Sequence, residues 1–370
     1  HQIHPSVFIM RPVVTPAVLA ALLAAGSMPA AAQLTAPASA TSSPAIASTA
    51  GPAPKLSAAD QKRVEAIQQY QHDLVSVVAL RADPDYLLGA AILARPFKNQ
   101  TPGLDFDSLS QRAATAPNAG PAAEWVRLDL CGSKDDCPNA KAFEFLKKNA
   151  ADNAALWIVA MDMAAEKKDA KAEQAALEKA AAAQTYDDYY GKALAGVAKA
   201  TEVLPPLADT TQGAHDGQPD NGDGVRVLVA ASATQNHLRP NLGPVVDACD
   251  KDAVAKHQGT RQACLKLAHT LTWGSSPIAR AVGLHIQGDL EPAKKAENDQ
   301  AARNVAWQVH EYSGLLQRAL ADPALASQWL AAARNGGTEL SLMLATLRAS
   351  NIPTDAPADA VPASAGSSGQ

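Results

Sequence analysis

Residues 152–185 have the sequence DNAALWIVAMDMAAEKKDAKAEQAALEKAAAAQT, and this stretch decides the fold. Its first half is apolar around Trp157, and a polar turn then ends at Asp169. Leu177 and Ala180 follow three residues apart, so they share one face of a second helix. The stretch therefore predicts a hairpin of two antiparallel helices.

This spacing resembles one tetratricopeptide repeat, a 34-residue helical hairpin in which a large residue on the first helix packs against small and aliphatic residues on the second. Weaker echoes of the pattern occur at 83–94 and 322–334. The sequence departs from the family at three positions: Lys168 replaces the usual glycine, Met161 a small residue and Ala164 an aromatic one. The resemblance implies an irregular right-handed superhelix of antiparallel helical hairpins.

Signals for helix starts recur along the rest of the chain. Each places a capping residue or a glycine before a run of helix formers, and several have proline in the first turn. These signals occur at Ser57, Asp83-Pro84, Gly120-Pro121 and Asp322-Pro323. The one ambiguous run, 225–231, could be a strand, but it has no second strand with which to pair and is assigned to a helix. The sequence predicts an all-α fold over 57–352.

The amino-acid composition argues against some classes of function and fold. The chain has 370 residues, with 32 Lys and Arg against 37 Asp and Glu, which gives a formal net charge of -5. A nucleic-acid-binding domain usually carries a basic surplus, so no nucleic-acid partner is expected. Aromatic residues make up only 4%, which argues against a β-sandwich or a barrel.

The first part of the chain has the features of an export signal. Met10 and Arg11 precede an apolar run at 13–25, and small residues surround Ala32. The apolar run is short for a membrane-spanning helix, so we expect cleavage after Ala32 and no stable membrane insertion, with an uncleaved anchor as the alternative. Residues 1–9 are interpreted as a mis-called start or a non-native remnant. The mature protein is expected in the periplasm or outside the cell.

Low-complexity stretches divide the remainder into segments. Residues 33–56 consist almost entirely of Ala, Ser, Thr, Pro and Gly, and predict a disordered tether. A Pro-Pro pair and a Gly/Asp/Asn cluster mark a linker at 205–224, between an N-terminal lobe at 57–204 and a C-terminal lobe at 225–352. The Pro/Ala/Ser-rich residues 353–370 predict a disordered tail.

The linker also contains four residues with oxygen-bearing side chains that could bind calcium. An EF-hand loop requires glycine at its sixth position and glutamate at its twelfth. Counted from Asp216, those positions hold Asn221 and Val227. A solvated linker is therefore favoured over a calcium site formed by Asp216, Asp220, Asn221 and Asp223.

Four cysteines, an even number in a chain expected to be exported, predict disulfide bonds. Three pairings are possible, and grouping along the sequence favours Cys131–Cys137 and Cys249–Cys264. The second pair brackets a turn at 257–259, where two helices could run away from and back along each other. A zinc site formed by Cys249, Cys264, His257 and His269 is the alternative. It is disfavoured because Cys264 and His269 are five residues apart and so do not share a helix face.

No motif of a hydrolase nucleophile, a phosphate-binding loop, a dinucleotide fold or a zinc protease occurs, and no cofactor or metal is expected. Tyr-rich surfaces suit recognition. We therefore expect a binding surface at Asp162, Tyr186 and Tyr189, with burial of Tyr186 between hairpins as the structural alternative. The adjacent acids Asp187 and Asp188 are expected to be solvated.

The leading functional hypothesis is therefore an exported, non-catalytic module that binds another envelope protein or a peptide. A cell-wall-acting hydrolase is the alternative, and it would need a carboxyl group kept protonated in an apolar pocket. Glu144, between two phenylalanines, and Glu311 are the candidates for that role. A purely structural secreted protein is a third hypothesis.

Overall fold

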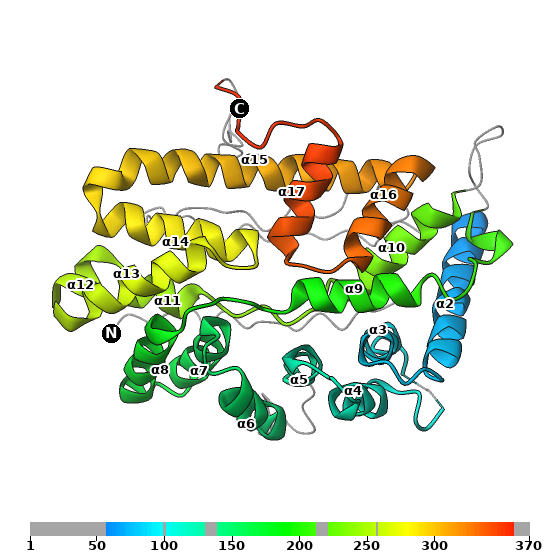
Figure 1. Ribbon diagram of the computed structural model, residues 1–370, viewed down its shortest axis with the longest axis horizontal. Coiled ribbons are helices and arrows are strands. Elements are labelled where there is room, and N and C mark those ends of the chain that lie inside the picture. Colours follow the sequence, from blue (N-terminus) through cyan, green and yellow to red (C-terminus); the bar gives the residue numbers. More distant parts are fainter. Residues whose placement is uncertain (1–56, 99–100, 130–138, 212–220, 257, 359–370) are drawn as a thin grey trace.

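The computed structural model describes residues 57–98, 101–129, 139–211, 221–256 and 258–358. Within these ranges the chain forms sixteen α-helices and two short 3₁₀ helices, and it forms no strand (Figure 1). The predicted all-α fold class is confirmed. The helix α10 contains the whole of the ambiguous run 225–231.

The predicted signal at 1–32 and the tether at 33–56 lie outside the described residues. Among the helices that the structure describes, none is both long enough and apolar enough to cross a bilayer.

The helices before residue 205 are α2 (Ala58–Val78), α3 (Pro84–Ala94), α4 (Phe106–Thr115), α5 (Pro121–Arg127), α6 (Ala140–Asn149), α7 (Ala154–Glu166), α8 (Ala170–Ala182) and α9 (Tyr190–Ala200). Those after it are η1 (Ala208–Thr210), α10 (Gly222–Thr234), α11 (Gly243–Ala248), α12 (Lys251–Lys256), α13 (Gln258–Thr272), α14 (Pro277–Leu290), η2 (Pro292–Lys294), α15 (Lys295–Ala319), α16 (Pro323–Arg334) and α17 (Glu339–Ala349).

Side-chain caps begin these helices where the sequence predicts them. The Ser57 hydroxyl accepts a hydrogen bond from the backbone N–H of Asp60, at the start of α2. The carboxylates of Asp83 and Asp322 cap α3 and α16 in the same way, each followed by proline in the first turn. Each cap satisfies backbone N–H groups that the helix itself leaves unbonded, so the local sequence defines the helix starts.

Buried apolar side chains form two main cores. The first joins α2, α3, α4 and α9 to α10 and α16, and the second joins α5–α8 to α11, α13 and α14. In Figure 1, α9 runs through the middle of the view, with α3 and α4 below it and α16 and α17 above. Each core thus combines helices from the predicted lobes 57–204 and 225–352. The predicted boundary at 205–224 therefore does not separate two cores, because turn-forming residues alone do not specify a domain boundary.

The helices α3 and α9 approach each other backbone to backbone. A Cβ atom added at Gly89 would lie 2.2 Å from the carbonyl oxygen of Gly196. One added at Gly196 would lie 2.7 Å from the carbonyl oxygen of Asp85. Glycine at both positions is therefore required for this close crossing, which brings the first core together.

The hairpin predicted at 152–185 is present as α7 and α8, which pack along each other. Trp157, Leu177 and Ala180 are all buried between neighbouring helices. Lys168, at the position where the tetratricopeptide family has glycine, has a φ of 56° and so adopts the left-handed conformation that glycine favours. The next helix packed on α8 is α13, which comes almost ninety residues later in the chain.

The prediction that residues 353–370 are disordered is wrong for the first residues of this range. Residues 353–358 are described, and hydrogen bonds tie them to α15. The physical reason is that α15 carries polar side chains that satisfy the backbone of this segment, a contribution that its own composition does not reveal. Residues 359–370 lie outside the described part of the chain.

Candidate functional site

The structure does not bring the predicted binding residues together on one surface. Tyr186 is buried, so the prediction that it is exposed is wrong and the packing alternative is correct. Tyr189 is half-buried, with its ring 5.6 Å from that of Trp125. Asp162 accepts a hydrogen bond of 2.8 Å from the side chain of Asn241.

A cluster of polar side chains lies where four segments meet in the middle of the molecule. Asp188 precedes α9, and His237 and Arg239 lie between α10 and α11. Ser275 lies between α13 and α14, and Glu339 is the first residue of α17. We call these five residues the polar junction.

The two carboxylates of the polar junction share one guanidinium group. Arg239 donates to both oxygens of Glu339, at 2.7 and 2.8 Å, whereas its Nη1 is 3.6 Å from Oδ2 of Asp188. Asp188 is only 1% exposed, and its Oδ2 has no hydrogen-bond partner among the described residues. Burial raises the pKa of Asp188, and the charge of Arg239 offsets this only in part. The expectation that Asp188 is solvated is therefore wrong.

His237 contacts the backbone of Asp188 and has a defined tautomer. Its Nε2 is 2.5 Å from the backbone carbonyl oxygen of Asp188. A carbonyl oxygen only accepts hydrogen bonds, so Nε2 carries the proton. Burial lowers the pKa of His237 to about 4, and the ring is therefore neutral at pH 7.

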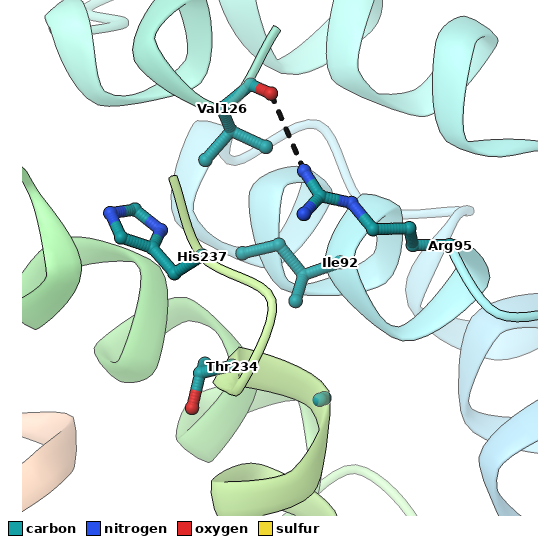
Figure 2. A pocket seen from close by; sticks show the side chains of 6 residues that line it. Ile92, Arg95, Val126, Thr234 and His237 are labelled. Carbon is teal, nitrogen blue, oxygen red and sulfur yellow. Dashed lines mark hydrogen bonds between the residues drawn. The ribbon is translucent and has the colours of Figure 1, made fainter. Parts of the chain in front are cut away.

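Asp188 and His237, the buried acid and base of the polar junction, are not accessible to a substrate. The space beside His237, lined by Ile92, Arg95 and Val126, is too narrow for a water molecule. Figure 2 shows the ring of His237 near Val126 and the Arg95 guanidinium, which donates to the Val126 carbonyl and helps to fill the space. Because it is closed to a substrate, the polar junction acts as a structural contact that joins four chain segments.

The acids predicted for a hydrolase lie elsewhere. Glu144 is exposed and forms an ion pair with Lys147, one turn along α6. Glu311 is half-buried on α15. The exposed, ion-paired carboxyl group of Glu144 therefore does not meet the requirement for a protonated catalytic acid in an apolar pocket.

The polar junction fixes the loop between α13 and α14. The Ser275 hydroxyl lies 3.2 Å from both the backbone N–H and the carboxylate of Asp188. The backbone N–H of Ser275 donates to the carbonyl of Tyr186, and its carbonyl accepts from the N–H of Leu340. With all of these groups bonded, the loop has one defined conformation.

This loop and the first turn of α14 present apolar residues to solvent. The side chain of Trp273 is 73% exposed and that of Ile278 is 38% exposed. The Arg280 guanidinium lies 6.0 Å from the centroid of the Trp273 ring. We call these three residues the Trp273 corner. No local pattern predicts this corner, because a tryptophan next to a glycine gives no signal of exposure.

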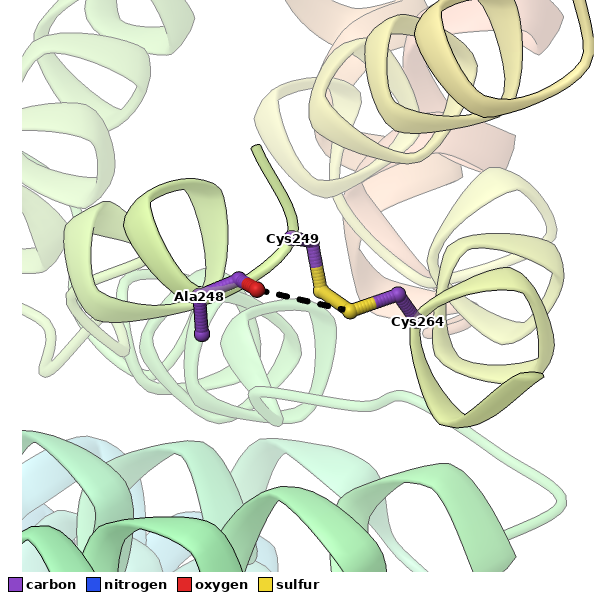
Figure 3. The surroundings of a disulfide bond; sticks show 3 residues. All are labelled: Ala248, Cys249 and Cys264. Atoms are coloured by element: carbon purple, nitrogen blue, oxygen red, sulfur yellow. Dashed lines mark hydrogen bonds between the residues drawn. A yellow bond between two sulfur atoms is a disulfide. The ribbon is translucent and has the colours of Figure 1, made fainter. Parts of the chain in front are cut away.

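One of the two predicted disulfides is present. Cys249 and Cys264 are joined with an S–S distance of 2.02 Å and link the end of α11 to α13 (Figure 3). Their sulfur atoms are bonded to each other, so the zinc alternative is wrong. The predicted pair Cys131–Cys137 lies outside the described residues.

Two of the residues considered for calcium have structural roles. Asn221 caps α10 by accepting a hydrogen bond from the Gly224 N–H, and Asp223 forms an ion pair with Arg226. Asp216 and Asp220 lie outside the described residues. No group of three or more His, Cys, Asp or Glu side chains in the described part of the chain is arranged to hold a metal ion.

Comparisons with known proteins give no family for this chain. No protein-family model, no curated protein and no solved structure matches it.

Proposed function

We propose that this chain is an exported protein that binds another protein or a peptide of the cell envelope and carries out no catalysis. The observation that carries the proposal is the Trp273 corner. There a large apolar side chain is exposed on a loop that the polar junction holds in one conformation. Tryptophan and arginine are the residues most enriched among those that dominate binding energy at interfaces. A fixed loop also loses little entropy on binding.

Arg280 adds a charge to the apolar surface. Its Nε is buried without a hydrogen-bond partner among the described residues, and burial lowers the pKa of its guanidinium group. An acidic group on the partner would stabilise this cation while an apolar group covers Trp273. The partner surface is therefore expected to combine a carboxylate with apolar side chains.

Export is part of the proposal. The sequence pattern from Met10 to Ala32 supports it, and the disulfide between Cys249 and Cys264 is of the kind that oxidising compartments maintain. The α7–α8 hairpin supports a tetratricopeptide-like superhelix by analogy, and such folds commonly present binding surfaces.

The experiment compares the wild-type chain with Trp273→Ala and with Leu80→Ala, a matched control because Leu80 is also highly exposed, at 84%. Each chain is immobilised and exposed to envelope extract, and bound proteins are quantified by mass spectrometry. The proposal predicts a partner that Leu80→Ala retains and Trp273→Ala loses at least tenfold. Equal retention by all three chains contradicts the role of Trp273. In a separate assay, release of soluble fragments from purified cell wall would instead support the hydrolase.

A further inference from the structure

The helix α15 carries three polar side chains on one side near its middle. Asn304, Trp307 and Gln308 are three and four residues apart, which places them on one face of a helix. We call them the α15 ladder. The chain that follows α17 passes over α15, and residues 353–356 contact this ladder (Figure 1).

Two members of the α15 ladder bind backbone atoms of the segment. The Trp307 indole N–H donates to the carbonyl oxygen of Pro353, at 2.9 Å. The Gln308 amide donates to the carbonyl oxygen of Thr354, at 2.7 Å. Proline-rich peptides are likewise recognised by grooves lined with aromatic side chains.

Asn304 binds the segment at two points. Its amide nitrogen donates to the carboxylate of Asp355, at 2.9 Å. Its amide oxygen accepts from the backbone N–H of Ala356, at 3.1 Å. The Asp355 side chain is therefore recognised specifically, whereas the rest of the segment is recognised through its backbone.

The segment is held in a way that permits exchange. Pro353 and Asp355 are exposed and Thr354 and Ala356 are only half-buried, so release would expose little apolar surface. Gln308 is 7% exposed, and its Oε1 has no hydrogen-bond donor among the described residues. The segment thus leaves one buried acceptor of the ladder unused.

The sequence repeats the bound pattern. Residues 353–356 are PTDA, and residues 357–360 are PADA, so two Pro-x-Asp-Ala tetrads follow one another directly. Asp359 and Ala360 lie outside the described residues. The repeat identifies proline, aspartate and alanine as the shared elements, and aspartate is the side chain that Asn304 contacts.

We propose that the α15 ladder is a peptide-binding site for Pro-x-Asp-Ala segments of a partner chain, and that residues 353–356 occupy it until such a segment replaces them. This inference deepens the proposed binding function by naming a class of ligand. The ladder and the Trp273 corner share no residue, so each can fail without the other.

The test uses a fluorescently labelled peptide, SNIPTDA, which corresponds to residues 350–356. The full-length chain carries Asp355→Ala, Ala356→Pro and Asp359→Ala, which together remove two of the hydrogen bonds of its own segment and the aspartate of the second tetrad. Fluorescence anisotropy is expected to show peptide binding to this opened variant at least tenfold tighter than to the intact chain.

Two matched controls accompany this measurement. The peptide SNIPTAP lacks the same two contacts and is expected to bind at least tenfold more weakly. Asn304→Ala in the opened variant should lower affinity for SNIPTDA to a similar extent. Absence of peptide binding to a folded opened variant, or binding that Asn304→Ala leaves unchanged, would overturn the proposal. A dimer of the intact chain that SNIPTDA dissociates would assign the ligand to a second copy and not to a partner.

Hydrogen exchange on the unmodified chain tests the same claim should the opened variant fail to fold. An exchangeable segment predicts that the Ala356 amide exchanges at least 100-fold faster than that of Val305, which lies in the middle of α15 and is buried. Equal protection of the two amides would show that the segment is a fixed part of the fold.

Discussion

The imidazole of His237 donates from Nε2 to the backbone carbonyl of Asp188, at 2.5 Å, beneath a carboxylate that is itself almost completely buried. The two residues are 49 positions apart in the chain. Their contact holds the segment before α9 against the segment after α10 and fixes the tautomer of His237, whereas burial keeps its ring neutral.

This contact predicts how stability depends on pH. The folded-state pKa of His237 is lowered to about 4 from 6.5, so its contribution is fully present above pH 6.5 and is lost as the pH falls towards 4. His237→Gln keeps an N–H donor but does not titrate. Between pH 7.5 and 4.5 we expect the wild type to lose about 2–3 kcal/mol more unfolding free energy than the variant does.

Urea unfolding of both chains across this range measures the difference. Comparing the two chains matters because the pKa of Asp188 is raised, so protonation of that carboxyl acts in the opposite direction. Parallel pH profiles for wild type and His237→Gln would show that His237 does not titrate as its burial requires.

The crossing of α3 and α9 gives a second prediction. Gly89→Ala places a methyl group against the carbonyl of Gly196 and should separate the helices, at a cost of about 2–3 kcal/mol or more. Gly314→Ala is the matched control, since Gly314 lies in α15 with open space where its Cβ would be. It should stabilise the protein by about 0.5–1 kcal/mol, because alanine favours a helix over glycine. Equal urea midpoints for the two variants would exclude a close helix contact.

The third prediction concerns the disulfide between Cys249 and Cys264, which are 15 residues apart. Replacing both by alanine should lower the unfolding free energy by about 3 kcal/mol, chiefly because the unfolded chain gains freedom. Urea unfolding measures this loss, and alkylation before reduction should leave Cys249 and Cys264 unmodified in the wild type, because neither has a free thiol. Rapid alkylation of either thiol in the folded protein would contradict the bond.

Features encoded by neighbouring residues could be predicted from the sequence. Asp83 and Asp322 cap helices through contacts two or three residues away, and each precedes a proline, so the signal is local. Cys249 and Cys264 could be paired because they are only 15 positions apart in the chain. The all-α class follows from such signals repeated along the chain.

The polar junction could not be predicted in this way. Asp188 is buried because Ser275 bonds it from 87 positions away and Arg239 pairs with it from another segment. Next to Asp187, it has the sequence context of a solvated acid. The exposure of Trp273 likewise depends on which helices cover the α13–α14 loop, and no local pattern specifies that.

The bound segment 353–356 illustrates the same limit. Its composition is that of a disordered tail, yet Trp307 and Gln308 bind its backbone from 46 positions away. Backbone recognition leaves little trace in the recognised sequence, so the partner helix decides whether such a segment is ordered.

The most direct test of the proposed function is photo-crosslinking in living cells. A photoreactive amino acid replaces Ile278, an exposed member of the Trp273 corner, in one exported full-length chain that keeps Trp273, and Leu80, which is also highly exposed, in another. A surface that recognises an envelope partner predicts a discrete crosslinked product from position 278 and none from position 80. No product from position 278, or the same products from both positions, would contradict the account.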